Sequence, residues 1–171
     1  MATHQTNCDI CNRLAAIREG KHPAHGITVI AELDTGFAVM GDSQFFRGYS
    51  LLLCKTPATE LDELPKPIRL RFLEEMSQLA EAVRKATGAF KLNYESLGNL
   101  VHHLHWHVFP RRESDPDPKA PVWGQMPKLG SDADTQSKFN PERDRGLLES
   151  IRAELHAIRA RANQVHDSAN V

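Results

Sequence analysis

The sequence predicts an α+β fold in which five short strands form a mostly antiparallel sheet, with one long helix between the third and fourth strands. Several short runs of β-branched and apolar residues are bounded by turn residues, which is typical of strands. One longer stretch carries apolar residues at helical spacing. The first two strands are joined by a tight turn, which favours a hairpin and antiparallel pairing over a parallel crossover. The 171 residues, 40% of them hydrophobic, suffice for one core without disulfides.

The N-terminal third contains the first helix and three strands. A short helix is expected over 9–19, because apolar residues recur at helical spacing and Gly20 follows its end. Strands over 27–33 and 37–41 flank the turn 34–36 and form a hairpin. A third strand over 49–55 follows Gly48, and its SLLLC run is apolar on both faces, so this strand should be central and buried.

The most regular helix is expected over 65–87, where an apolar stripe begins after prolines suited to a first turn and ends at Gly88. Strands over 90–94 and 101–109 complete the sheet. From 111 to 140 the chain is rich in Pro, Asp, Ser and Lys, and with Pro110 just before it we expect a loop without regular structure. After Asn140 and Pro141 a last helix should run to Arg161.

Composition excludes several functional classes. Lys and Arg total 21 against 22 for Asp and Glu, so the net charge of −1 provides no general attraction for a nucleic-acid polymer or an anionic membrane. No stretch approaches the roughly 18 to 20 apolar residues that span a bilayer, and the start shows no secretory signal, so we expect a cytoplasmic protein. Three cysteines are an odd number, and reduced thiols are expected.

The most informative segment is the HLHWHVF run over 103–109, in which three histidines alternate with larger apolar residues. In a strand, alternate side chains share a face, so His103, His105 and His107 should project together, roughly 6.5 to 7 Å apart. Burying three imidazoles is costly unless each is hydrogen-bonded or binds a ligand. The pattern therefore indicates a functional site rather than a folding requirement.

Imidazole chemistry suits an attack on phosphorus. Its unperturbed pKa near 6.5 leaves a neutral ring with a free lone pair at neutral pH. One nitrogen of His105 can donate to a fixed acceptor, which fixes the tautomer and directs the other nitrogen at phosphorus. His103 and His107 can donate to phosphate oxygens or to the leaving group. The segment thus predicts displacement at phosphorus through a covalent intermediate on His105.

Two other interpretations stay open. The first is a surface strand that happens to be rich in histidine. The second is metal binding, because alternate histidines can share a zinc ion and Cys8 and Cys11 supply a ligand pair at the usual spacing. One CxxC pair alone is weak evidence, since structural zinc normally takes four protein ligands.

The run over 103–109 resembles the histidine triad (HIT) motif, and the similarity extends from about 8 to 123. The resemblance implies a homodimer with joined sheets and a purine nucleotide whose α-phosphate lies beside His105, the nucleophile. It implies that His103 supports and orients His105, and that His107 contacts phosphate oxygens. It also implies ribose binding by Asp42, for which a turn-forming aspartate is the alternative.

Further positions follow from the same resemblance. Asn93 and Asn99 correspond to polar residues near the phosphates and leaving group, and Trp123 to a tryptophan that can approach the nucleotide or serve as a packing anchor. Tyr49 stands where many relatives carry a further histidine that contacts phosphate. In this chain the contact is either made by the phenol of Tyr49 or absent. Lys55-Thr56-Pro57 stands where zinc-binding relatives carry a histidine, which argues against a full zinc site, although His102 could substitute.

Leu100 replaces a Ser or Thr seen before the triad in the phosphoramidase branch. We therefore expect a hydrolase or transferase acting at the α-phosphate of a dinucleoside polyphosphate (Ap4A-like). The alternatives are a purine nucleoside phosphoramidase and a non-catalytic nucleotide- or zinc-binding interaction module. A HIT-like catalytic domain is expected over 1–125, with a loop and C-terminal helical extension over 126–171. No cofactor is required, and a structural zinc is not favoured.

Overall fold

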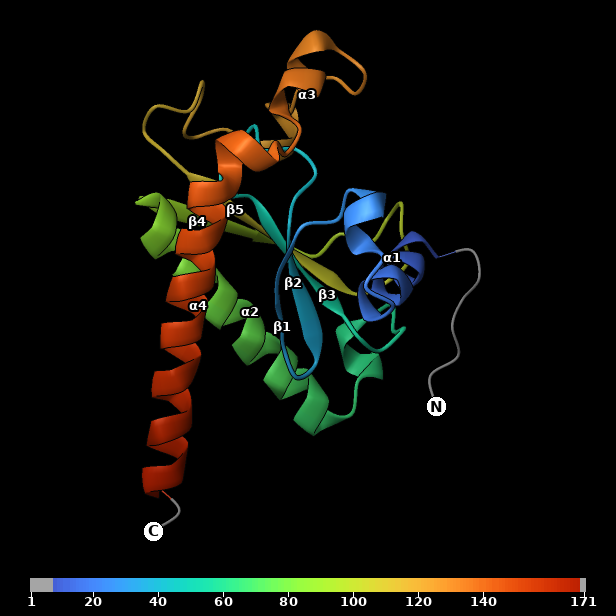
Figure 1. Ribbon diagram of the computed structural model, residues 1–171, viewed down its shortest axis with the longest axis vertical. Coiled ribbons are helices and arrows are strands. Elements are labelled where there is room, and N and C mark those ends of the chain that lie inside the picture. Colours follow the sequence, from blue (N-terminus) through green and yellow to red (C-terminus); the bar gives the residue numbers. More distant parts are fainter. Residues whose placement is uncertain (1–7, 170–171) are drawn as a thin grey trace.

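A computed structural model describes residues 8–169 and shows an α+β fold built on one sheet (Figure 1). The elements follow one another as α1 (Asp9–Arg18), the 3₁₀ helix η1 (His22–His25), β1 (Val29–Glu32), β2 (Gly36–Met40), β3 (Ser50–Cys54), η2 (Leu61–Glu63), α2 (Lys66–Thr87), β4 (Lys91–Glu95), β5 (His105–Arg111), η3 (Val122–Gly124), α3 (Asp132–Ser137) and α4 (Pro141–Ala169). No helix of the described part of the chain combines the length and apolar character needed to cross a bilayer.

The five strands lie in the order β1-β2-β3-β5-β4, and every neighbouring pair is antiparallel. The predicted sheet, the hairpin β1–β2 and the long helix between the third and fourth strands are confirmed. β3 is central and largely buried, as the SLLLC run predicted. β5 pairs with β3 on one side and β4 on the other, so the start of the histidine-rich strand is held in the middle of the sheet.

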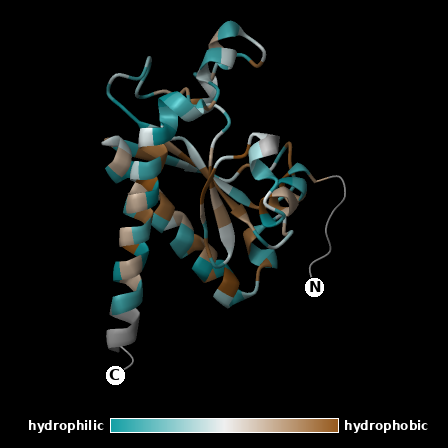
Figure 2. Ribbon diagram, viewed as in Figure 1, coloured by the Kyte–Doolittle hydropathy of each residue, from teal (hydrophilic) through white to brown (hydrophobic). Residues whose placement is uncertain are grey.

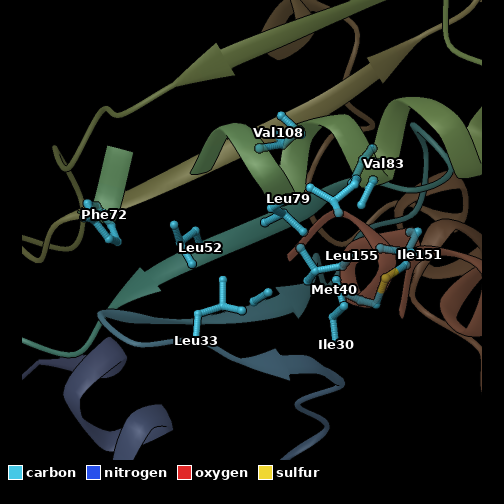
Figure 3. Packing of buried hydrophobic residues seen from close by; sticks show 14 of the residues in the cluster. Ile30, Leu33, Met40, Leu52, Phe72, Leu79, Val83, Val108, Ile151 and Leu155 are labelled. Atoms are coloured by element: carbon cyan, nitrogen blue, oxygen red, sulfur yellow. The ribbon is translucent and has the colours of Figure 1, made fainter. Parts of the chain in front are cut away.

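Helices α2 and α4 pack together over one face of the sheet (Figure 1). α2 begins after Pro65, has Pro67 in its first turn, and ends at Gly88 with φ 64°, a left-handed conformation that favours glycine. Leu79 of α2 and Ile151 and Leu155 of α4 meet Leu52 and Val108 of the sheet (Figure 3). The apolar stripes of the two helices therefore share the main core with the sheet (Figure 2).

The opposite face of the sheet carries two smaller apolar clusters. α1 packs on this face through Leu14 and Ile17 against Phe37 and Leu53. Farther along, Phe109 of β5 packs against Phe46, Tyr49 and Val122. His105 and His107 lie on the same face of β5 as Phe109, between these clusters. The histidine face is thus enclosed by α1 on one side and an aromatic cluster on the other.

The structure corrects three expectations about the elements. The strand expected over 101–109 begins only at His105 and reaches Arg111, so Pro110 lies inside it. Pro110 is tolerated because β3 pairs only as far as Val108, and a missing N–H costs no bond on that side. The expected loop over 111–140 contains η3 and the short helix α3, whose N-cap is Ser131. The last helix continues beyond Arg161 to Ala169.

The two edges of the sheet differ. Arg152 of α4 donates from Nε to the carbonyl of Ile30 at 3.2 Å and from Nη2 to the carbonyl of Val29. The guanidinium therefore occupies backbone acceptors of the edge strand β1. β4, at the other edge, has an exposed side chain at Tyr94, and Phe90 just before it is also exposed.

Candidate active site

His105, the first residue of β5, is held in one tautomer by the backbone. Its Nδ1 lies 2.5 Å from the carbonyl oxygen of His103. A carbonyl oxygen only accepts, so Nδ1 carries the hydrogen and Nε2 keeps its lone pair. The hydroxyl of Ser96 donates to the carbonyl of His105 at 2.9 Å and fixes its backbone. A buried ring with a fixed orientation and an unprotonated Nε2 meets the requirement for a nucleophile.

His107 completes a chain of hydrogen bonds. Its Nε2 lies 3.0 Å from Nε2 of His105, and because the His105 nitrogen accepts, His107 donates. Nδ1 of His107 then accepts from the Tyr49 hydroxyl at 2.5 Å. Burial raises the pKa of Tyr49, which keeps the phenol proton in place. Burial, and next the charge of His105, lower the pKa of His107 to about 4, so its ring is neutral at pH 7.

His103 does not share the pocket of the other two histidines, which corrects the prediction that all three rings project from one strand face. The chain turns before β5, where the His103 N–H donates to the carbonyl of Val101 at 2.8 Å. The ring is buried under α1, and its Nε2 donates to the carbonyl of Cys54 at 2.8 Å. His103 therefore contacts His105 through its backbone carbonyl and not through its ring.

The lone pair of His103 faces two thiols. Nδ1 lies 3.5 Å from Sγ of Cys8 and 3.4 Å from Sγ of Cys11, and all three side chains are buried. These ligand atoms lie within 4.8 Å of one another, and within residues 8–169 no fourth His, Cys, Asp or Glu joins them. His102, the substitute considered from the sequence, is exposed.

This Cys–His cluster fits three of the four positions of a tetrahedral zinc ion. The donor set is soft, and the Nε2 hydrogen bond of His103 to Cys54 leaves Nδ1 as the ligand nitrogen. When bound, such an ion supplies a cross-link between Cys8 and Cys11 at the start of α1 and the segment before β5. The three cysteines form no disulfide in the structure.

A cavity of about 230 Å³ opens in front of His105. Asp42, which follows β2, Tyr49 and Trp123 line the cavity together with Arg13 of α1. Both oxygens of Asp42 accept from Arg13, at 3.2 Å from Nη1 and 2.8 Å from Nη2. The structure therefore brings the predicted residues Asp42, His105 and Trp123 to one pocket.

Trp123 forms one wall of this pocket and also packs. It lies edge-on to His107 at 5.3 Å and to Phe109 at 5.4 Å between ring centroids. Its Nε1 donates to the carboxylate of Glu95. The ring remains 44% exposed, so it can both hold the loop against the sheet and offer surface to a ligand.

Asn93 and Asn99 do not line the pocket. The side-chain oxygen of Asn93 accepts from Nη1 of Arg111 at 2.9 Å, beside a separate cavity of about 310 Å³. Asn99 lies exposed on the bend before β5. Arg13 and Ser96 were not among the residues predicted from the sequence. For Arg13 the only signal was Asp9 four residues earlier on the same helix, a common surface pair.

The fold and the site together define a class of protein: a five-stranded antiparallel sheet that presents a tautomer-fixed histidine, supported by a second histidine, to a small cavity. The profile of the HIT domain matches residues 25–114, more than half of the 171 residues. The chain therefore belongs to the HIT family, and the resemblance seen in its motif is confirmed. At the level of the family, this membership supports a function of the nucleotide hydrolase or transferase type.

Individual relatives are distant. Adenylylsulfatase HINT3 of Arabidopsis thaliana is 25% identical over 119 residues, which are 67% of this chain and 57% of that protein, so the chain spans little more than half of its length. A histidine triad protein of Sinorhizobium meliloti 1021 is 27% identical with a TM-score of 0.64, over 77% of this chain and 91% of that chain. A Zn-bound histidine triad family protein of Mycobacterium smegmatis shares the fold at 21% identity and a TM-score of 0.62, over 90% and 96% of the two chains.

Proposed function

We propose that the chain cleaves a dinucleoside polyphosphate (Ap4A-like) at its α-phosphate through a covalent nucleotidyl-His105 intermediate. The observation that carries this proposal is the hydrogen bond from His105 Nδ1 to the His103 carbonyl at 2.5 Å, which leaves Nε2 with its lone pair beside the cavity. Asp42 in the same cavity is a suitable acceptor for ribose hydroxyls. Trp123 offers a ring surface to the nucleotide.

In the first chemical step, the Nε2 lone pair of His105 forms a bond to the α-phosphorus. The bond from phosphorus to the bridging oxygen breaks, and its electron pair leaves with the departing phosphate. The Nε2–H of His107, which donates to Nε2 of His105 before substrate binds, then donates to a phosphate oxygen instead, which frees the His105 lone pair and stabilises the charge that develops on the phosphate. Water then attacks the phosphorus and gives up a proton to the solvent, the P–N bond breaks with its electron pair returning to Nε2 of His105, and a nucleoside monophosphate is released. A transferase differs only in the second acceptor.

Incubation with a dinucleoside tetraphosphate tests this proposal. Mass spectrometry of protein quenched in denaturant at alkaline pH, where the P–N bond to histidine is stable, should show one added nucleotidyl group, and chromatography should show a nucleoside monophosphate as product. Intact substrate and an unmodified chain would contradict it.

The identity of the leaving group is the second question for this site. The A. thaliana relative is named an adenylylsulfatase, and adenylyl sulfate, a nucleoside phosphoramidate and a dinucleoside polyphosphate all present a nucleotidyl α-phosphorus. The same His105 attack serves each of them. When these three substrates are compared, the polyphosphate should give the highest kcat/KM. A higher kcat/KM for adenylyl sulfate or for the phosphoramidate would show that the dinucleoside polyphosphate is not the preferred substrate class.

Tyr49→Phe should lower kcat about tenfold, less than the roughly 10²-fold contribution at the low end for a positioned general acid or base, because His107 itself remains. Without the phenol, Nδ1 of His107 has no donor, so His107 can move its hydrogen to Nδ1 and turn a lone pair toward His105. Steady-state kinetics measure the change. The control is Tyr94→Phe, which changes the other, exposed tyrosine. An unchanged kcat for Tyr49→Phe would show that the phenol does not set the His107 tautomer.

We also propose a homodimer formed through β4. The β1 edge is occupied by Arg152, whereas β4 is an edge flanked by the exposed apolar side chains of Phe90, Tyr94 and Leu97. Pairing of two copies of β4 joins the sheets and covers these side chains.

Sedimentation should therefore give a dimer at micromolar concentration. Tyr94→Asp should shift it to monomer, because a charge is then buried in the joint. Leu129→Asp changes a side chain that is 85% exposed in the loop before α3 and should leave the dimer intact. A monomeric wild type, or equal behaviour of both variants, would refute this interface.

A further inference from the structure

A separate cavity, of about 460 Å³, lies at the end of β5 opposite His105. Arg112, which follows the last residue of this strand, lines the cavity together with Arg47 and Ser114. Each residue of a strand advances the chain by about 3.3 Å, so Arg112 and His105 are roughly 20 Å apart. No described residue lines both this cavity and the one in front of His105. The cavity is therefore distinct from the candidate active site.

The two arginines of this cavity are held in place. Nη2 of Arg112 donates to the carbonyl of Arg47 at 2.9 Å. Nη2 of Arg47 donates to the carbonyl of Arg143 at 3.5 Å and to Oδ1 of Asp144 at 3.3 Å. Among residues 8–169 these side-chain bonds engage only one nitrogen of each guanidinium. The other nitrogens of both fixed groups remain available to a ligand.

The positive charge around the cavity exceeds the negative charge. Arg112 is partly buried and forms no ion pair within the described part of the chain. Asp115 also lines the cavity, but it is bound by Nε of Arg111 at 2.8 Å. The contacts of this region join four guanidinium groups to only two carboxylates, namely Arg47, Arg111, Arg112 and Arg143 to Asp115 and Asp144. Two positive charges of this group are therefore not compensated.

The uncompensated charge is costly to the folded protein. Burial lowers the pKa of Arg112, and the charge of Arg47 acts in the same direction, whereas Asp115 opposes them. A lowered pKa means that the charged guanidinium is less stable in this place than in water. An anion bound between the two arginines would remove that cost.

We propose that this cavity binds a small phosphate monoester at a site separate from the nucleotide pocket. Such a phosphate carries about 1.5 to 2 negative charges at pH 7, which matches the uncompensated positive charge. Its three oxygens can accept from the planar forks of Arg47 and Arg112. The hydroxyl of Ser114, which has no hydrogen-bond partner within residues 8–169, is a further donor at the same cavity.

The remaining wall favours a monoester over inorganic phosphate. Phe45, Pro116 and Leu147 line the cavity beside the arginines. An apolar group attached to the phosphate would contact these side chains and leave water, which strengthens binding. Inorganic phosphate would leave the apolar wall uncovered.

Calorimetry of the full chain with phenyl phosphate and with inorganic phosphate tests this inference without any nucleotide. Wild type should bind phenyl phosphate at least about threefold more tightly than inorganic phosphate, because the ring covers the apolar wall. Arg112→Met should weaken phenyl phosphate binding at least about tenfold, since it removes hydrogen bonds from a charged donor. Arg112→Lys keeps the charge but lacks the fork, and should weaken binding about threefold.

Arg18→Met is the matched control, because Arg18 is exposed at the end of α1 and does not line the cavity. It should bind both probes as wild type does. Thermal unfolding without ligand should give similar midpoints for wild type and Arg112→Met, because Arg112 has no ion pair to lose within residues 8–169.

A wild type that does not bind phenyl phosphate would overturn the site. Equal binding by wild type and Arg112→Met, or by wild type and Arg112→Lys if the first variant does not fold, would do the same. Equal affinity for inorganic phosphate and phenyl phosphate would overturn the assignment to a monoester. These outcomes are independent of the reaction proposed for His105, which is tested by nucleotide turnover.

Discussion

His105→Asn should reduce kcat by at least about 10⁴-fold, the scale of loss seen when an enzyme loses its nucleophile. An amide nitrogen has no free lone pair and cannot form the bond to phosphorus. The asparagine side chain can still donate to the His103 carbonyl, which His105 Nδ1 now contacts at 2.5 Å. The variant should therefore keep its fold and its ability to bind nucleotide while losing the covalent step.

Three measurements check this expectation. Steady-state turnover of a dinucleoside tetraphosphate gives kcat, mass spectrometry of the quenched protein gives the nucleotidyl adduct, and calorimetry with AMP shows whether the pocket remains. The control is His156→Asn, which removes an exposed histidine of α4 that lies outside the cavity. Equal turnover by wild type and His105→Asn would show that the nucleophile lies elsewhere.

Local signals were sufficient to predict most of the fold. The β1–β2 hairpin and α2 depend on nearby residues: a turn over 34–36 in one case, and an apolar stripe ending at Gly88 in the other. The start of β5 depends on distant residues and was placed four residues too early. His103 leaves the strand direction because its ring donates to Cys54 and lies against Cys8 and Cys11, contacts that join segments about 50 and 90 residues away.

The site was predicted in the same uneven way. Alternation along one strand placed His105 and His107 correctly on one face, because alternation is a local property of extended chain. The partners that set their tautomers are a carbonyl and the phenol of Tyr49, and no sequence period predicts such contacts. Arg13 reaches Asp42 across 29 residues, so it resembled an ordinary surface pair with Asp9 until the structure placed α1 over the cavity.

His107 should also make the stability of the protein depend on pH. Burial is the main cause that lowers its folded pKa to about 4, whereas the unfolded value is near 6.5. Between these two values the unfolded chain binds a proton that the folded chain does not. The free energy of unfolding must therefore fall as the pH falls from about 6.5 to about 4. The pKa of His103 is lowered as well, chiefly by burial, and acts in the same direction.

The expected size of the His107 effect is about 3 kcal/mol, because each pKa unit corresponds to about 1.4 kcal/mol. Urea unfolding of wild type and His107→Asn at pH 7, 5.5 and 4 measures it, since asparagine does not titrate. The variant should lose less stability than wild type over this range, and the difference should develop below pH 6.5. Burial acts to raise the pKa of Asp34, but its bonds to Arg71 and Arg159 lower it overall. Acidic groups of this kind lose their contribution to the free energy of unfolding at lower pH, and they do so equally in both proteins. If the free energy of unfolding fell equally with pH in the two proteins, the His107 ring would be protonated as easily in the folded state as in the unfolded state. The hydrogen-bond chain Tyr49–His107–His105 would then lack the neutral donor that the proposed reaction requires.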